Sequence, residues 1–326
     1  MKRKQLVGIA IAAIIFVIVG MIGAAGAASL NSTLSELSSL GSVVSSEPYN
    51  SVAIIDIAGT ISSSTTVNAL GVTTSTYDQS FILNTIAELE ESNGNVGIIL
   101  RVDSTGGEAN AADAVYLALE RYKENTGRLV YAYAENYMAS GAYYISCAAD
   151  RITANRNAWV GSIGVYINMT NYKELYDKLG VKPIYIKSSE NKAMGNGYDE
   201  LTEEQVAIYQ GLVDTIYDQF LGIVCDARGY TRDEAEPICD GRVYTTNQCL
   251  ENGLIDDVEN VFEDYVYEII DELGASDYYY PQPSTAGFLS NLFSALSSLK
   301  TKSETELLLE TLENSESGVP MLLYVG

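Results

Sequence analysis

Compact apolar runs alternate with helical segments in the middle of this chain, and this alternation restricts the available folds more than any other feature. The runs lie at residues 52–57, 96–102 and 129–134, and the second is apolar on both faces, as a buried parallel strand is. Residues 78–92 and 109–122 between them carry apolar side chains at helical spacing. This order predicts an α/β fold with parallel strand pairing.

The third run leads into residues 136–145, Asn-Tyr-Met-Ala-Ser-Gly-Ala-Tyr-Tyr-Ile. We expect a small-residue helix over 141–149, which places Ser140 where a strand passes into a helix. The first N–H groups of a helix have no partner within it and can face a developing oxyanion. Ser140 is therefore a candidate nucleophile, although serine is also a preferred N-cap and an isolated serine here would be read as one.

The sequence contains no histidine, which excludes a Ser-His-Asp triad and a Cys-His dyad. A hydrolase with this composition would need a lysine, a carboxylate or an N-terminal amine as its base. The formal net charge of −24 argues against a nucleic-acid partner, because phosphate contacts need clustered Lys and Arg.

The four cysteines, at 147, 225, 239 and 249, form no CxxC pair. Without histidine, most zinc sites also lose their commonest ligand, so no metal or cofactor is expected. We expect Cys147 to be a buried thiol, whereas Cys239 and Cys249 could form a disulfide if the fold brings them together.

Residues 6–28 are uncharged and mostly apolar, and a bilayer is crossed by about 20 such residues. Lys2, Arg3 and Lys4 precede them, so the positive-inside rule predicts a cytoplasmic N-terminus and an extracytoplasmic remainder. A cleaved signal peptide is the alternative, since small residues at 24–28 offer cleavage sites. The run is longer than a typical signal-peptide core, which favours an uncleaved single-pass anchor in the cell membrane.

Two glycine-containing bends flank the Ser140 segment. In Asp103-Ser-Thr-Gly-Gly-Glu108, paired glycines at the end of a parallel strand can expose N–H groups to a ligand. The Walker spacing is absent, so an oxyanion hole with the Gly107 amide is favoured over a phosphate loop, and a plain tight turn is the alternative. The second bend holds Ser162 but is not a Gly-x-Ser-x-Gly elbow, so Ser162 is not assigned as nucleophile.

The later part of the chain is predicted to hold a helix ending at 180, a strand over 181–187 and a polar loop that contains Lys192. A long amphipathic helix at 201–229 and a final helix at 260–273 follow. Tyr278 to Pro283 is predicted to break the chain.

The motifs, taken in order, resemble those of the signal peptide peptidase A family, membrane-anchored bacterial serine proteases with a Ser-Lys dyad. The resemblance covers about residues 52–273. The matching segments are Asp103-Ser-Thr-Gly-Gly107, Met138-Ala-Ser-Gly141, Gly161-Ser-Ile-Gly-Val165, Lys192, Gly241-Arg-Val-Tyr244 and Gly253-Leu-Ile-Asp256.

The resemblance implies Ser140 as nucleophile, Lys192 as general base, Gly107 and Gly141 as oxyanion amides, and Ser162 as a hydroxyl that orients the lysine. It implies an α/β fold of the Clp protease/crotonase type, a spiral of ββα units, preceded by one transmembrane helix. It further implies a homo-oligomer, a ring whose active sites combine serine and lysine from neighbouring subunits. The expected substrates are apolar peptides such as cleaved signal peptides.

The chain departs from the family pattern at Thr105, Ala142 and Ala193, where proline, a second glycine and aspartate are usual. None of these changes removes a reacting atom, and Lys187 is a competing lysine outside the motif. Two other functions stay open: a catalytically inactive membrane scaffold of the same fold, and a crotonase-like acyl-CoA enzyme.

The resulting domain organisation is a cytoplasmic tip and anchor (1–28), a stalk (29–50), a protease domain (51–273) and a C-terminal extension (274–326). In the extension, apolar residues at 288–296 share one helical face, and the last seven residues are apolar and strand-like. We expect the tail to add as a strand to a partner or to occupy a substrate groove.

Overall fold

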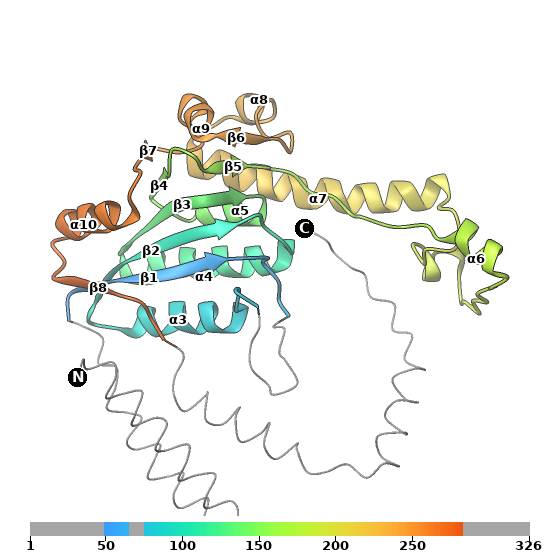
Figure 1. Cartoon of the computed structure of the whole chain (residues 1–326), viewed down its shortest axis with the longest axis horizontal. Coiled ribbons are helices and arrows are strands. Elements are labelled where there is room, and N and C mark those ends of the chain that lie inside the picture. The colour runs from blue at the N-terminus through green and yellow to red at the C-terminus, as the bar shows by residue number, and fades with distance from the viewer. Residues whose placement is uncertain (1–48, 65–74, 283–326) are drawn as a thin grey trace, which may run out of the picture. The chain divides into compact units, whose positions relative to one another are not determined.

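The computed structural model describes residues 49–64 and 75–282, all of which belong to one compact unit (Figure 1). The predicted anchor, nearly all of the stalk, and residues 283–326 of the C-terminal extension lie outside the described residues. Within the described ranges, no helix combines the length and the apolar character needed to cross a bilayer.

The strands and helices alternate through most of the chain, as predicted. In chain order they are β1 (Ser51–Ala58), α3 (Gln79–Glu91), β2 (Asn95–Ser104), α4 (Ala109–Thr126), β3 (Leu129–Ala139), α5 (Gly141–Ser146), β4 (Arg151–Ala154), β5 (Trp159–Gly161), α6 (Lys173–Leu179), the 3₁₀ turn η1 (Glu190–Ala193), α7 (Glu203–Arg228), α8 (Arg232–Ala235), β6 (Val243–Thr245), α9 (Thr246–Asn252), β7 (Asp257–Val258), α10 (Phe262–Leu273) and β8 (Asp277–Tyr279).

One sheet organises the described residues, with the strand order β6-β5-β3-β2-β1-β8 and with β4 and β7 off this path. All of its pairings are parallel except that between β5 and β6. The central strand β3 pairs with two different strands along its length: residues 131–134 pair with β4, and residues 137–139 pair with β5. The mixed α/β fold predicted from the sequence is therefore confirmed, and the carboxyl end of β3 lies where its neighbouring strands separate.

Helices cover both faces of the sheet. On one face, α3, α4, α5 and the C-terminal part of α7 enclose a core that includes Ile57, Ile86 and Val115, all fully buried. On the other face, α10 packs over Val52, Ile99 and neighbouring residues. Full burial of an aliphatic side chain stabilises a fold by about 1.5–3 kcal/mol, so these two cores hold the central strands firmly in place.

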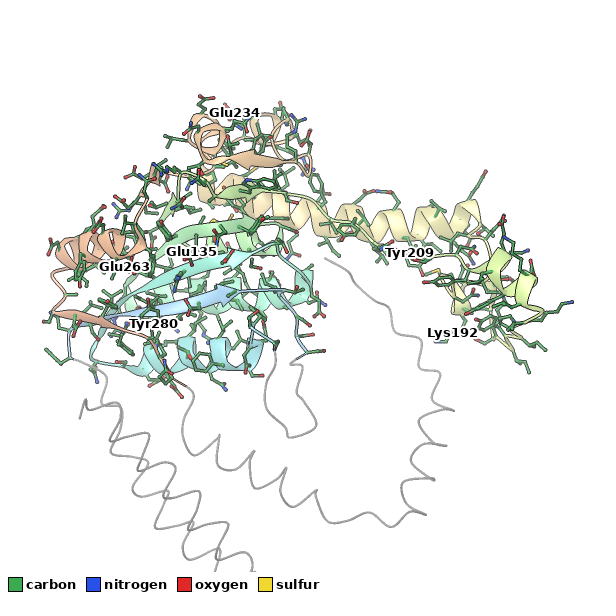
Figure 2. The ribbon with its side chains drawn as sticks, viewed as in Figure 1. Glu135, Lys192, Tyr209, Glu234, Glu263 and Tyr280 are labelled. Carbon is green, nitrogen blue, oxygen red and sulfur yellow. The ribbon has the colours of Figure 1, made fainter. Side chains whose placement is uncertain are left out.

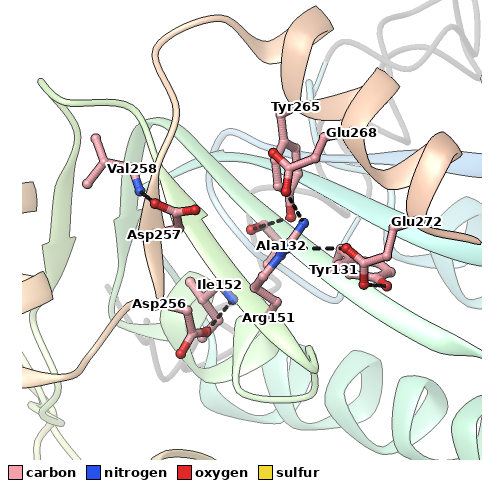
Figure 3. A network of polar contacts seen from close by, with 10 residues as sticks. All are labelled: Tyr131, Ala132, Arg151, Ile152, Asp256, Asp257, Val258, Tyr265, Glu268 and Glu272. Atoms are coloured by element: carbon pink, nitrogen blue, oxygen red, sulfur yellow. Dashed lines mark hydrogen bonds and ion pairs between the residues drawn. The ribbon is translucent and has the colours of Figure 1, made fainter.

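Polar contacts around Arg151 add to the α10 contact (Figure 3). Its guanidinium lies 5.4 Å from the ring centre of Tyr131 and 5.8 Å from that of Tyr265. It also pairs with Glu268 at 2.9 Å and Glu272 at 3.2 Å, and the Tyr131 hydroxyl donates to Glu272. This network ties α10 to β4 and to the amino-terminal half of β3.

Two sequence-based expectations are wrong. Residues 181–187 form no strand: Ile184 is 86% exposed and Ile186 fully exposed, and they have no neighbouring strand among the described residues. Residues 278–282 do not simply break the chain, because Tyr278 and Tyr279 belong to β8, which pairs in parallel with β1.

The four cysteines are free thiols. Cys147 is buried, as expected. Cys239 and Cys249 are also buried and do not form the disulfide considered from the sequence.

An arm, defined here as residues 166–212, extends from the core at the N-terminal part of α7 (Figure 1). A capping box between Thr202 and Gln205 starts the helix. Large apolar side chains of the arm are exposed, among them Leu175, Leu179, Val181, Ile184, Ile186 and Leu212. Further along α7, Phe220, Leu221 and Val224 are buried in the core. One helix therefore joins an exposed apolar segment to the packed domain.

Candidate active site

Ser140 follows β3 directly and has an unusual backbone conformation, with φ +54° and ψ −122°. Its N–H donates to the Gly161 carbonyl at 2.8 Å, and its carbonyl accepts from the Tyr144 N–H at 3.0 Å. Ser140 occupies the N-cap position of α5, but its side chain makes no capping hydrogen bond, so the hydroxyl is not used to cap the helix. A non-glycine residue in such a conformation costs on the order of 1–3 kcal/mol, and strain of this kind concentrates at functional sites.

Gly106 lies directly against the Ser140 turn, where a side chain would not fit. Its φ is +97°, and a Cβ built on it would lie 2.7 Å from both the Ser140 Cβ and the Gly141 nitrogen. Only glycine allows both the positive φ and the close approach.

The Gly107 and Gly141 amides lie next to each other. A Cβ on Gly141 would be 3.4 Å from the Gly107 nitrogen. Within the part of the chain that the structure describes, neither N–H donates a hydrogen bond. Two free donors beside one serine can receive the oxyanion of a tetrahedral intermediate.

Ser140, Gly107 and Gly141 all open onto one pocket, which encloses about 470 Å³ including space continuous with solvent. The other lining residues are mostly small or apolar: Ala109, Ala112, Tyr144, Gly164, Val165, Tyr166, Ile216 and Phe220. No lysine or carboxylate is among these lining residues. Within one described chain, the pocket lining therefore contains a serine and two neighbouring amides but no lysine or carboxylate that could act as a base.

Tyr144 contributes its ring to the pocket while its hydroxyl is held by other polar groups. The hydroxyl donates to Asp113 at 2.6 Å and accepts from Gln219 at 2.6 Å. Burial, followed by the hydrogen bond to Asp113, raises the pKa of Tyr144. A tyrosine that stays protonated cannot serve as the base, and its ring instead packs on Phe220 of α7 with centroids 4.9 Å apart.

Ser162 lies beside this site. It follows Gly161, which pairs with Ala139 and accepts from the Ser140 N–H. Ser162 also has a positive φ, +50°, and its N–H donates to the Arg242 carbonyl at 2.8 Å.

Lys192 does not lie beside Ser140 in the same chain. It belongs to η1, is exposed, and lies at the far end of the arm (Figure 2). Its neighbour Asn191 contacts Gln205 at the start of α7 at 3.1 Å, whereas the pocket is lined from Ile216 onward. From Gln205 to Ile216 the helix rises about 16 Å, which is more than a lysine side chain can bridge. The competing Lys187 pairs with Glu190 at 3.0 Å on the same arm.

Of the five site residues predicted from the sequence, the structure brings Ser140, Gly107, Gly141 and Ser162 together and leaves Lys192 apart. The sequence did not reveal the packing role of Gly106, although the paired glycines after a strand were the visible signal. It also gave no role to Glu108, whose contacts depend on Ser62 and Ser63, more than forty positions earlier in the chain.

Comparisons with known proteins support a peptidase relationship. The model of peptidase family S49 matches residues 123–275. A candidate signal peptide peptidase SppA of Enterococcus faecium is 32% identical over 182 residues, which are 56% of this chain and 53% of that protein. A candidate protease of Synechocystis sp. is 31% identical over 205 residues, which are 63% of this chain and 68% of that protein.

Among solved structures, a variant of the membrane-bound stomatin-specific protease in complex with a substrate peptide is similar at a TM-score of 0.44 and 17% identity. The match covers 76% of this chain and 98% of that one. The chain spans about half the length of the Enterococcus relative and about two thirds of the Synechocystis relative.

Proposed function

Because the chain belongs to peptidase family S49 and is similar to signal peptide peptidase SppA, as its motifs predicted, we propose that it is a serine endopeptidase with a Ser-Lys dyad. The observation that carries this proposal is the pocket in which a strained serine meets two amides that have no acceptor among the described residues. A serine held only for packing would not need this arrangement.

In the proposed reaction, the neutral amine of Lys192 accepts the proton of Ser140 Oγ as that oxygen bonds to the substrate carbonyl carbon. The carbonyl oxygen becomes an oxyanion and receives hydrogen bonds from the Gly107 and Gly141 amides. The lysine then returns the proton to the leaving amine as the C–N bond breaks. Water hydrolyses the resulting ester by the same route and frees Ser140.

We place the lysine in a second copy of the chain. Ser140 finds no base among the residues that line its pocket, and Lys192 is carried away from it on the arm. Exposed apolar side chains such as Ile184 and Ile186 favour burial of the arm against another molecule. A head-to-tail contact, in which each arm reaches the next subunit, closes into a ring, and the partner subunit's Lys192 would complete each site.

The remaining elements of the proposal follow from the same family relationship. Ser162, the residue directly after the strand β5 that pairs with β3, would orient the incoming lysine. The mostly apolar pocket suits apolar peptides, and cleaved signal peptides are the proposed substrates. The anchor at residues 6–28, the extracytoplasmic location and the Clp protease/crotonase-type spiral of ββα units are part of this proposal.

The test is a peptidase assay on the full chain, purified in detergent, with a fluorogenic apolar peptide. We expect Ser140→Ala and Lys192→Ala each to lose at least about 1,000-fold in kcat, because each removes a reacting group. Lys187→Ala is the matched control, a second lysine of the arm that should leave the rate unchanged. An assembled wild-type enzyme without activity would instead favour the inactive scaffold.

A further inference from the structure

The carboxylate of Glu108 accepts three hydrogen bonds from the segment that follows β1. Its Oε1 accepts from the Ser62 hydroxyl at 2.9 Å. Its Oε2 accepts from the Ser63 N–H at 2.8 Å and from the Ser63 hydroxyl at 2.7 Å. We call Glu108, Ser62 and Ser63 the Glu108 cluster. Three donors on one side chain fix the position of Glu108 relative to two residues far away in the sequence.

The backbone next to the Glu108 cluster is joined to the same segment. Ile61 and Gly107 form an isolated parallel bridge. The Ile61 N–H donates to the Gly106 carbonyl at 3.0 Å, and the Glu108 N–H donates to the Ile61 carbonyl at 2.8 Å. The contact is so close that a Cβ on Gly107 would lie 1.9 Å from the Ile61 oxygen. The position of Gly107 therefore depends on the position of residue 61.

A second tie holds the start of the same loop. The buried Ser104 hydroxyl donates to the Gly59 carbonyl at 2.5 Å and accepts from the Gly106 N–H at 3.1 Å. The Gly106 N–H is thus used within the loop and the Glu108 N–H is used by Ile61, while the Gly107 amide between them is left without an acceptor in the described part of the chain. Of these three consecutive amides, the Gly107 N–H is the one that the described residues leave available to a ligand.

We propose that Glu108 is a positioning residue that holds residues 104–108 against Ile61, so that the Gly107 N–H is fixed where the oxyanion forms. This inference rests on the proposed function, because it assigns Gly107 a part in the same reaction. Glu108 does not line the pocket and touches no reacting atom; it acts through Ile61 and Gly107.

The charge state of Glu108 suits this role. Burial acts to raise the pKa of Glu108, but the hydrogen bonds from Ser63 and Ser62 outweigh it and lower that pKa. The side chain therefore stays an acceptor for all three donors. A carboxylate is needed because a carboxamide offers only one oxygen, and its NH₂ group would meet the donors of Ser63.

The test compares Glu108→Gln and Glu108→Ala with wild type in steady-state peptidase kinetics. A misplacement of about 1 Å costs about 100-fold, so we expect kcat to fall about 10-fold in Glu108→Gln and about 100-fold in Glu108→Ala, with KM changed less than about threefold. The matched control is Glu90→Gln. Glu90 of α3 also accepts side-chain hydrogen bonds, from Arg121 and Asn125 of α4, but it lies outside the pocket lining. The kcat of the Glu90→Gln variant should therefore equal that of wild type.

Hydrogen–deuterium exchange on the same variants tests the hold on the loop without reference to catalysis. We expect faster exchange at residues 104–108 in Glu108→Ala, with exchange at 96–102 of β2 unchanged. Unchanged exchange at the loop would overturn the inference whatever the activity. Faster exchange with a wild-type kcat would also overturn it, because the loop would then be free without cost to the reaction.

The results that would refute the proposed function differ from those that would refute the role of Glu108. If wild type is inactive and Ser140→Ala behaves identically, the serine peptidase assignment is refuted, while the exchange experiment still decides whether Glu108 holds the loop. If wild type is active and only Glu108→Ala is indistinguishable from it, the positioning inference alone is refuted.

Discussion

The conversion Gly106→Ala tests how strictly residues 104–108 and the turn at Ser140 depend on each other. Gly106 has φ +97°, where L-residues are disfavoured, and a Cβ there would lie 2.7 Å from the Gly141 nitrogen and 2.9 Å from the Ala139 carbonyl oxygen. Both neighbours are backbone atoms of the strand and helix that flank Ser140. They cannot move aside without moving the serine.

Two costs add at this position. A left-handed conformation costs an L-residue about 1–2 kcal/mol. Inserting a methyl group into a filled space costs a further 1–3 kcal/mol or so. Gly106→Ala should therefore destabilise the fold by about 2–5 kcal/mol, a large part of the roughly 5–15 kcal/mol that holds a domain together.

Gly127→Ala is the matched control. Gly127 ends α4 with φ +67°, and a Cβ on it would meet nothing within 4 Å. It should show only the conformational cost, about 1–2 kcal/mol, and no loss of activity. Denaturant unfolding measures both free energies, and steady-state kinetics should show a fall in kcat of at least about 100-fold for Gly106→Ala alone.

The reasoning would be refuted if Gly106→Ala matched Gly127→Ala in both stability and kcat. Residues 104–108 would then be free to move away from Ser140, and their close approach to it would not define the proposed active site.

Three further predictions concern stability and assembly. Arg228→Met should destabilise the fold by about 2–3 kcal/mol in denaturant unfolding. The Arg228 side chain is only 9% exposed, and it donates to both carboxylate oxygens of the partly exposed Asp256 and to the Gly253 carbonyl. An unchanged unfolding midpoint would contradict this prediction. Burial acts to raise the pKa of Asp256, but hydrogen bonds from Arg228 and the Ile152 N–H outweigh it and lower that pKa. The Asp256 carboxylate therefore stabilises the fold fully above its pKa in the unfolded chain, about 3.9, and this stabilisation is lost as the pH falls through the lower pKa of the folded protein. The stability difference between wild type and Asp256→Asn should therefore shrink below about pH 4 in thermal unfolding, and a difference that stays constant to pH 2 would refute the assignment. The double change of Ile184 and Ile186 to serine should leave the subunit folded, as judged by circular dichroism, because both side chains are exposed in the single chain. It should lower the oligomer mass in analytical ultracentrifugation and abolish peptidase activity; an intact active oligomer would exclude these two residues from the interface.

The central strands could be predicted because each carries its own signal. β1 and β2 are apolar runs bounded by turn residues, and burial on both faces requires that composition whatever lies beside them. Residues 181–187 show the limit of this reasoning, since an apolar run becomes a strand only with a partner to pair with. β8 shows the converse: Asp277–Tyr279 precedes a proline and looks like a break, but β1 offers an open edge.

Some features of the candidate site could likewise be predicted from the sequence, whereas others could not. Ser140 could be found from the sequence because a strand-to-helix junction is a local pattern, and Gly107 because paired glycines follow a strand. The contact between Gly106 and Ser140 could not, because it depends on how β2 and β3 align at their ends, where a register shift lies between Val102 and Ser104. The separation of Lys192 from Ser140 depends on the length and direction of α7, which sequence spacing does not reveal.

The most direct test of the shared active site is to co-express Ser140→Ala and Lys192→Ala chains with different affinity tags and to assay the oligomers that carry both tags. Each variant alone should be inactive. If serine and lysine come from neighbouring subunits, random mixing in a head-to-tail ring leaves about one site in four with both groups, so about a quarter of wild-type activity should return. Mixed oligomers without activity, beside an active wild type, would contradict the shared site and require a base for Ser140 within its own chain.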